Sequence, residues 1–296
     1  MTMMTMFKGA YTALVTPFAA DGSIDEQALR KLVEAQIAGG IDGIVPCGTT
    51  GESPTITVEE QERIFRIAVS QAKGRCTVIA GAGANSTEEA IRLTQYAKDA
   101  GCDATLHVSP YYNKPTQEGL FRHFRAVADA VDIPIILYNI KGRTAVNIET
   151  ETLLRLSAVK NIAGVKEASG DISQIMDVIG SVPQGFTVLS GDDNLTFPLM
   201  ALGGHGVVSV ASNLVPGEVS QMVHAMLKKD VEKARALHYR LLPLFKAIFI
   251  ETNPIPIKAA MAMKGMIEET YRLPLCEMQP KNRERLKAAL GKLGIL

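Results

Sequence analysis

The stretch TVIAGAGANSTEEAIRLTQYAKDAGCDATLHV, residues 77–108, contains one complete strand–helix–strand unit. Thr77–Ala80 and Ala104–Val108 are short apolar runs with β-branched residues, which is typical of buried strands. Between them, Ser86–Ala100 has a helical pattern that begins with the capping-type sequence STEE and stops at Gly101. The unit therefore predicts two parallel strands joined by a crossover helix.

The same unit recurs along most of the chain. The eight predicted strands are Tyr11–Thr16, Gly43–Cys47, Thr77–Ala80, Ala104–Val108, Pro134–Tyr138, Ile162–Lys166, Thr187–Leu189 and Gly206–Val210. Each interval holds one helix, for example Asp25–Ala38 after the capping-type sequence Ser23-Ile24-Asp25-Glu26, and Thr57–Ala72. Eight such units predict an α/β fold of the (β/α)8 barrel type over residues 1–229, with its eighth helix near Gly217–Lys228.

The rest of the chain, residues 230–296, has no strand pattern. It predicts a C-terminal helical subdomain with helices at Val231–Ile250, Ile257–Gly265 and Lys281–Lys292, interrupted by Pro254 and Pro256.

Composition narrows the class of protein. The 296 residues carry equal numbers of basic and acidic side chains and no basic stripe, which argues against a nucleic-acid partner. No stretch reaches the roughly 20 apolar residues that cross a bilayer, and Met1–Phe7 lacks the features of a signal peptide. The four cysteines are widely spaced without a CxxC motif, which predicts reduced thiols in a cytoplasmic protein. A net charge of zero is compatible with an oligomer.

The carboxyl ends of the strands are where a barrel of this kind places its chemistry. The sixth predicted strand ends in Lys166, and lysine is seldom buried. If Ile162 and Gly164 face the barrel interior, alternation places Lys166 there too, where burial favours the neutral, nucleophilic amine. The alternative is a lysine that turns outward to pair with Glu167 or Asp171.

Two neighbouring segments add to this interpretation. The fifth strand ends in Tyr138, and adjacent strands lie roughly 4.8 Å apart, so its phenol can relay protons to and from the amine. The alternative is a tyrosine that only packs at the rim. After the second strand, Gly48-Thr49-Thr50-Gly51 can bind a carboxylate through N–H groups and hydroxyls, if the glycines adopt positive φ; the alternative is a simple turn.

Two other segments imitate binding motifs. Gly81-Ala82-Gly83-Ala84-Asn85-Ser86 lacks the third glycine of a dinucleotide fingerprint, and Ser86 suits a helix cap better. Asp192-Asp193 could hold a metal, but the five histidines form no ligand pattern, which favours a loop-fixing role for these aspartates. Neither a metal nor an organic cofactor is predicted.

Together the chain resembles the dihydrodipicolinate synthase family, within the N-acetylneuraminate lyase superfamily. The resemblance runs from about Phe7 to the C-terminus. The segments that carry it are LVTPF (14–18), GTTGES (48–53), VSPYYNKPTQEGL (108–120), YNIKGRT (138–144), GVKEASGD (164–171), LSGDD (189–193), GGHGVVSV (203–210) and ETNPIPIK (251–258).

The resemblance implies roles by position. It implies a lyase that condenses pyruvate with L-aspartate-4-semialdehyde to 4-hydroxy-tetrahydrodipicolinate, the first committed step of lysine biosynthesis through diaminopimelate. It also implies a homotetramer, a dimer of dimers. The implied catalytic residues are the Schiff-base Lys166, the proton-transferring Tyr138, and its relay partners Thr49 and Tyr112, the last reaching in from a neighbouring subunit. The implied substrate contacts are Thr50 and Val208 for pyruvate, and Arg143 for the carboxylate of the second substrate.

Subfamily and regulation depend on fewer positions. Thr50, the run Tyr111-Tyr112-Asn113 and Arg143-Thr144 favour the synthases over the sialic-acid lyases. Lys141 stands where the family usually has proline, which frees φ and adds a charge two residues from Arg143. The resemblance also implies a lysine-binding cleft at a dimer interface. The positions that match this cleft are Ser53, Asn85, Glu89 and Tyr111.

Two alternatives remain. One is a sister pyruvate-dependent aldolase that acts on a sugar-derived 2-keto acid. The other is a non-catalytic protein that binds keto acids or lysine, which we would expect to have lost Lys166 or Tyr138.

Overall fold

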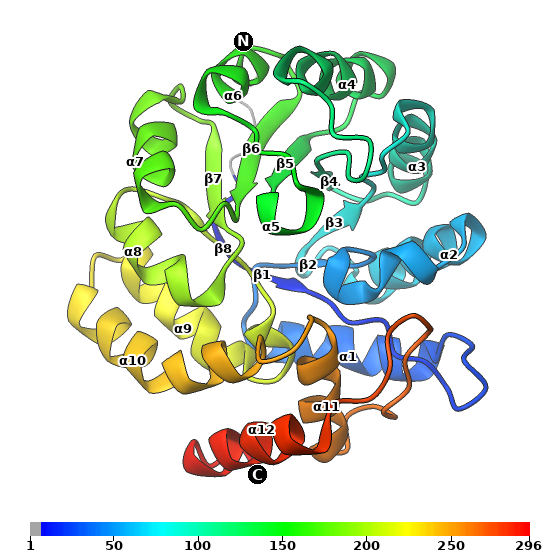
Figure 1. Cartoon of the computed structure of the whole chain (residues 1–296), viewed down its shortest axis with the longest axis vertical. Helices are drawn as coiled ribbons and strands as arrows, with labels where there is room; N and C mark the ends of the chain where they lie inside the picture. The colour runs from blue at the N-terminus through cyan, green and yellow to red at the C-terminus, as the bar shows by residue number, and fades with distance from the viewer. Residues whose placement is uncertain (1–6) are drawn as a thin grey trace.

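The computed structural model describes residues 7–296, so most of the stretch tested for a signal peptide lies outside the described residues. Its centre is a closed barrel of parallel strands in which each strand pairs with the next in sequence and the last pairs with the first (Figure 1). The strands are β1 (Gly9–Ala13), β2 (Gly43–Val45), β3 (Thr77–Gly81), β4 (Ala104–Val108), β5 (Ile135–Asn139), β6 (Ile162–Glu167), β7 (Thr187–Ser190) and β8 (Gly206–Ser209). The predicted (β/α)8 barrel is confirmed, although β1 begins two residues before the predicted Tyr11.

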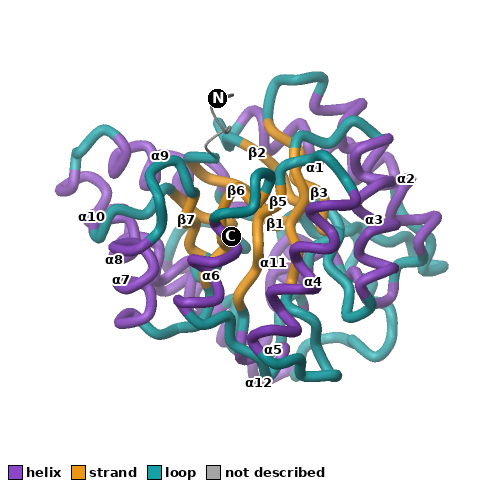
Figure 2. The backbone as a smooth tube through the Cα atoms, turned by 90° about the horizontal axis from the view of Figure 1, so that it is seen from above, coloured by secondary structure: helices purple, strands orange, loops and turns teal. Residues whose placement is uncertain are grey.

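Helices surround the strands on the outside of the barrel (Figures 1 and 2). They are α1 (Glu26–Ala38), α2 (Val58–Ala72), α3 (Thr87–Asp99), α4 (Gln117–Ala130), α6 (Thr150–Ser157), α7 (Ile172–Ser181), α8 (Thr196–Ala201) and α9 (Pro216–Leu227), with a short α5 (Lys141–Thr144) between β5 and α6. Thr57 and Glu60 form the predicted capping box of α2, and Ser86 caps α3. The prediction for α1 was wrong in one detail, because Asp25 caps this helix while the Ser23 hydroxyl donates to Asp21.

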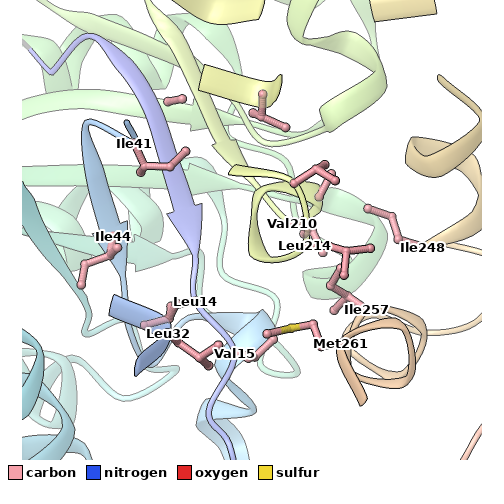
Figure 3. Close-up of a cluster of buried hydrophobic side chains, with 14 of the residues drawn as sticks. Leu14, Val15, Leu32, Ile41, Ile44, Val210, Leu214, Ile248, Ile257 and Met261 are labelled. Carbon is pink, nitrogen blue, oxygen red and sulfur yellow. The ribbon is translucent and has the colours of Figure 1, made fainter. Parts of the chain in front are cut away.

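Three further helices follow the barrel: α10 (Val231–Ala247), α11 (Ile255–Met263) and α12 (Pro280–Lys292). Pro256 lies in the first turn of α11 and does not interrupt a helix there, because proline needs no N–H donor at that position. Apolar side chains of this segment, such as Ile257 and Met261, join the same core cluster as Val210 and Leu214 beside β8 (Figure 3). The domain boundary after residue 229 stays a prediction.

The alternation of side chains is interrupted in β6. Ile135 of β5 pairs with Ile162, but the next residue, Ile136, pairs with Gly164, so Ala163 is an extra residue in β6. Ile162 consequently packs in the layer beneath the helices, and Ala163 packs in the barrel interior. The expectation that Ile162 faces the interior was wrong.

Gly164 is the residue at which the alternation resumes. A Cβ atom at this position would lie 2.5 Å from the Thr187 carbonyl oxygen, which leaves room for glycine alone. Beyond it the side chains alternate again, so Lys166 falls beside the interior residue Tyr138, as the sequence predicted.

Within residues 7–296, no helix is both long enough and apolar enough to cross a membrane.

Candidate active site

Lys166 and Tyr138 are paired residues at the carboxyl ends of β6 and β5. Each side chain is buried, with 5% of its residue surface exposed. The Lys166 ammonium nitrogen, Nζ, lies 4.0 Å from the centre of the Tyr138 ring. The predicted adjacency of amine and phenol is therefore present in the fold.

Burial sets the ionisation of the Lys166 amine. It lowers the pKa of Lys166 to about 8, an effect that the nearby carboxylates of Asp192 and Asp193 partly oppose and the Arg143 guanidinium assists. The described residues form no ion pair with Lys166, and the two proposed outward partners are engaged elsewhere. Glu167 accepts hydrogen bonds from the Ser169 and Asn139 nitrogens, and Asp171 caps α7. A substantial fraction of the amine is thus neutral near pH 8.

The phenol of Tyr138 is held in its neutral form. Burial raises the pKa of Tyr138 well above its ordinary value, and the Asp192 carboxylate acts in the same direction. A hydrogen bond with Thr49 and the charge of Arg143 oppose this rise. The phenol can therefore both donate and accept a proton in exchange with a neighbouring group.

The loop after β2 differs from its predicted conformation. Thr49–Gly51 forms a short 3₁₀ turn, and the residues with positive φ are Cys47 and Glu52, on either side of the glycines. The expectation that Gly48 and Gly51 adopt positive φ was wrong. Gly51 packs closely against β1 and the segment after it, because a Cβ atom there would lie 3.1 Å from the Leu14 carbonyl oxygen.

Thr50 is buried in this loop, and its hydroxyl accepts a hydrogen bond from Asn253 Nδ2 at 2.9 Å. Val208 is buried on β8, opposite Tyr11 of β1, in the same interior cluster as Tyr138.

Arg143 lies on the helical turn α5, directly after β5. Its side chain is exposed, and Nη2 donates to the main-chain oxygen of Asn253 at 3.0 Å. Lys141 is the first residue of α5, a position that accepts proline readily because its N–H has no partner within the helix. The substitution of lysine for proline is therefore compatible with the observed turn.

Tyr112 is not brought into the site of its own chain. Its residue surface is 91% exposed, and its backbone adopts φ 72, which is uncommon for a large side chain. The adjoining Tyr111 accepts a hydrogen bond from Asn85 Nδ2 at its carbonyl oxygen, and Asn113 donates back to the Asn85 carbonyl. The tip of this loop is thus held in a fixed shape that presents Tyr112 outward.

A cavity of about 380 Å³ opens beside these groups. Thr49 and Arg143 line it together with Ser53, Glu89 and Tyr111, three of the four residues of the predicted lysine cleft. The fourth, Asn85, contacts Tyr111 as described above. Residues of the predicted lysine cleft therefore line the same cavity as Thr49 and Arg143.

Residues 6–293 match the model of the Dihydrodipicolinate synthetase family. The chain belongs to this family. A 4-hydroxy-tetrahydrodipicolinate synthase from Syntrophobacter fumaroxidans is 54% identical over 292 residues, which cover 98% of this chain and 100% of that protein. The family and the lyase activity predicted from the sequence are thereby confirmed.

Solved structures of family members agree with this assignment. Dihydrodipicolinate synthase from Aquifex aeolicus superposes with a TM-score of 0.96 at 50% identity, covering 98% of this chain and 99% of that one. The family member from Cyanidioschyzon merolae, solved with lysine bound, gives a TM-score of 0.95 at 43% identity, covering 98% and 99%.

The paired aspartates of this family member have different surroundings. Asp193 is buried and accepts hydrogen bonds from the Ser209 hydroxyl and from the backbone nitrogens of Val210 and Ala211. This is the predicted loop-fixing role. Asp192 is half-buried, and its charge raises the pKa of Lys166 without contacting the amine.

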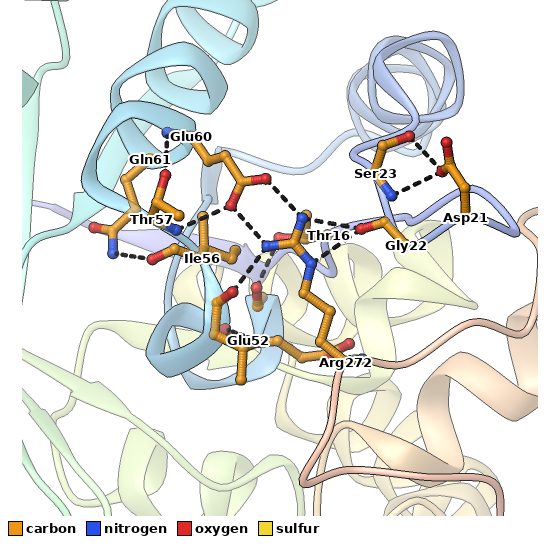
Figure 4. Close-up of polar contacts among 12 residues, drawn as sticks. Thr16, Asp21, Gly22, Ser23, Glu52, Ile56, Thr57, Glu60, Gln61 and Arg272 are labelled. Atoms are coloured by element: carbon orange, nitrogen blue, oxygen red, sulfur yellow. Dashed lines mark hydrogen bonds and ion pairs between the residues drawn. The ribbon is translucent and has the colours of Figure 1, made fainter.

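Several groups around the site were not singled out in the sequence. Lys258 Nζ lies 2.5 Å from Glu52 Oε1, with both side chains fully buried. Arg272 donates to both carboxylate oxygens of Glu60 on α2 and, through its backbone nitrogen, to Glu52 Oε2, which ties the C-terminal segment to the loop after β2 and to the start of α2 (Figure 4). Asn253 joins Thr50 to Arg143. The polar run Glu251-Thr252-Asn253, which follows the apolar segment 241–250 and opens the segment ETNPIPIK, was a signal that could have drawn attention to it.

Proposed function

We propose that this protein condenses pyruvate with L-aspartate-4-semialdehyde through a Schiff base on Lys166 and releases 4-hydroxy-tetrahydrodipicolinate. The observation that carries the residue assignment is the environment of Lys166. Its amine is buried, has no ion pair among the described residues, has a pKa lowered to about 8, and lies 4.0 Å from the Tyr138 ring. A neutral amine beside a proton-transferring phenol is what attack on a ketone requires.

The keto acid binds first in this scheme. Its carboxylate accepts hydrogen bonds from the loop that carries Thr49 and Thr50, and Val208 contacts it from β8. Lys166 adds to the ketone, and Tyr138, hydrogen-bonded to Thr49, transfers the protons that allow water to leave. The resulting imine withdraws electrons, so a methyl proton is lost and an enamine forms.

The second substrate then reacts with the enamine. Arg143 holds the carboxylate of aspartate semialdehyde, to which a planar guanidinium is well suited. The enamine carbon adds to the aldehyde, and the amino group of the semialdehyde attacks the imine carbon. Ring closure breaks the bond to Nζ and restores the free amine of Lys166. Every group in this cycle belongs to the protein or to the two substrates.

Tyr112 supports an oligomeric enzyme. Its exposed ring on a well-held loop is the arrangement expected of a side chain that completes the proton relay in a neighbouring subunit. We extend the proposal to a homotetramer built as a dimer of dimers, working in the cytoplasm.

The cavity beside the site supports a second ligand. Ser53, Glu89 and Tyr111 offer a hydroxyl, a carboxylate and a phenol, which suit the ammonium and carboxylate groups of free lysine. The proposal therefore includes lysine, the end product of the pathway, as a ligand that binds beside Asn85.

Reductive trapping tests the central claim. Pyruvate plus borohydride should add one reduced pyruvyl group to the peptide that contains Lys166, and Lys166→Arg should take up none. Label on a different lysine, or none, would refute the assignment. Condensation should then be measured with aspartate semialdehyde, N-acetylmannosamine and small sugar aldehydes. Preference for a sugar aldehyde would identify a sister aldolase, and trapping without any condensation would identify a keto-acid binding protein.

A further inference from the structure

Asn253 lies between α10 and α11, far in sequence from the barrel residues of the site, yet it is buried beside them. Its side-chain nitrogen Nδ2 donates to the Thr50 hydroxyl at 2.9 Å. Its main-chain oxygen accepts from Arg143 Nη2 at 3.0 Å. One residue thus contacts the loop assigned to the pyruvate carboxylate through its side chain, and the group assigned to the second carboxylate through its backbone.

The direction of the hydrogen bond to Thr50 determines what that hydroxyl can do. Because Asn253 Nδ2 is the donor, Thr50 Oγ1 accepts and keeps its own proton. That proton has no acceptor among residues 7–296. A buried hydroxyl whose lone pair is occupied and whose proton is free is suited to donate to an anion, and a carboxylate is the strongest acceptor a small keto acid offers.

The other end of the Asn253 amide shows that packing alone does not account for this residue. Its Oδ1 atom is buried and has no hydrogen-bond partner in the part of the chain that the structure describes. A buried acceptor without a partner costs stability, and an apolar side chain of similar size would avoid that cost. The donor end of the amide is therefore the part that the site uses.

We infer that Asn253 is a positioning residue for the proposed reaction: its side chain turns the Thr50 hydroxyl into a donor for the keto-acid carboxylate. Its main-chain oxygen holds Arg143 at a fixed place relative to that hydroxyl. The inference rests on the proposed function, and it makes the two contacts of Asn253 separable, because a substitution changes the side chain and leaves the main-chain oxygen.

Asn253→Asp tests the side-chain contact with little change in size. An aspartate oxygen accepts the Thr50 proton and adds a negative charge beside the carboxylate site, so the pyruvate concentration for half-maximal trapping on Lys166 should rise by roughly tenfold or more. Asn253→Ala should raise it by a smaller factor. The KM for aspartate semialdehyde at saturating pyruvate should stay within about twofold in both variants, because the bond to Arg143 is retained.

Asn161→Asp is the matched control. The Asn161 amide donates to three main-chain oxygens at the opposite end of β6, so the same chemical change there should lower thermal stability and leave pyruvate half-saturation unaltered. In a Thr50→Val background, Asn253→Asp should have no further effect on pyruvate.

The outcomes distinguish the inference about Asn253 from the proposed function on which it rests. Unchanged pyruvate half-saturation in Asn253→Asp, or an equal rise in the constants for both substrates, would overturn the inference and leave the proposed function standing. Failure of the unaltered protein to take up a pyruvyl label would overturn both. If Asn253→Asp does not fold, the same comparison of the two constants in Asn253→Ala decides.

Discussion

Two lysines are buried among the described residues, and their surroundings differ in one essential respect. Lys258 on α11 has its ammonium 2.5 Å from Glu52 Oε1, 4.4 Å from the centre of the Phe18 ring and 5.1 Å from that of Tyr271. Lys166 on β6 has the ring of Tyr138 beside it, and the charges of Asp192 and Asp193 act on it without an ion pair. Burial lowers the pKa of both lysines, but a carboxylate in contact opposes this only at Lys258.

The difference teaches how one chain uses the same side chain for two purposes. Direct contact with a carboxylate keeps a buried lysine charged and makes it a structural tie. Burial without contact leaves the amine close to its neutral form and makes it reactive. The two are connected, because Glu52 directly follows the Thr49–Gly51 turn, and Thr49 is hydrogen-bonded to Tyr138 beside Lys166. Lys258 therefore holds the loop that carries Thr49, the proposed relay partner of Tyr138.

Replacing the reactive lysine should give the largest effect. Lys166→Met should reduce condensation by roughly 10⁴-fold or more, because the covalent nucleophile is lost. Thermal unfolding should show equal or greater stability, since a buried amine without an ion pair is replaced by an apolar side chain. Loss of the folded state in this variant would contradict the distinction between the two lysines.

Replacing the structural lysine should act on stability. Lys258→Met leaves the buried Glu52 carboxylate without its partner and should lower the free energy of unfolding by about 3–5 kcal/mol in denaturant titrations. The double variant Glu52→Gln, Lys258→Met should recover most of this loss. Lys264→Met, an exposed lysine just past the end of α11, is the control and should change stability by no more than about 0.5 kcal/mol. A Lys258→Met protein as stable as this control would show that the ion pair is not a structural tie.

The pH dependence of pyruvyl labelling should give a smaller effect than the substitution of either lysine, and it tests whether the Lys166 amine is activated by burial. The neutral amine is the nucleophile, so the rate of pyruvyl labelling at low pyruvate should rise about tenfold per pH unit below the pKa of Lys166, about 8, and level off above it. The Asp192 charge favours the ammonium, so Asp192→Asn should move the midpoint to lower pH. A midpoint near the ordinary value for lysine would mean that burial does not activate this amine.

Local patterns were sufficient to predict the barrel and the adjacency of Lys166 and Tyr138. Ile136, Tyr138 and Lys166 lie on short apolar runs whose period and order give both the strands and their neighbours. The bulge at Ala163 could not be predicted, because nothing in the run Ile162–Lys166 distinguishes it from a regular strand. Positive φ at Cys47 and Glu52 was not predicted either. Gly48 and Gly51 lie between them, and glycine is the residue to which positive φ is normally assigned.

The sequence analysis also did not predict contacts between segments that are far apart along the chain. Asn253 and Thr50 are separated by 203 positions, and Glu52 and Lys258 by 206, and no single-sequence pattern pairs them. Both contacts depend on how the C-terminal helices pack against the barrel. The role predicted for Tyr112 also cannot be tested in a single chain, because its proposed partner groups belong to another subunit.

The extra residue in β6 has a practical consequence for protein engineers who wish to transplant this chemistry. Lys166 faces the interior only because Ala163 and Gly164 together occupy the space of one regular position. Deleting Ala163 would make Ile162 and Gly164 direct neighbours opposite Ile135 and Ile136, so the strand would become regular and the pairing of Lys166 with Tyr138 would be kept. A design that grafts the lysine and tyrosine onto an idealised barrel must therefore count positions back from Tyr138, and not forward from the start of the strand.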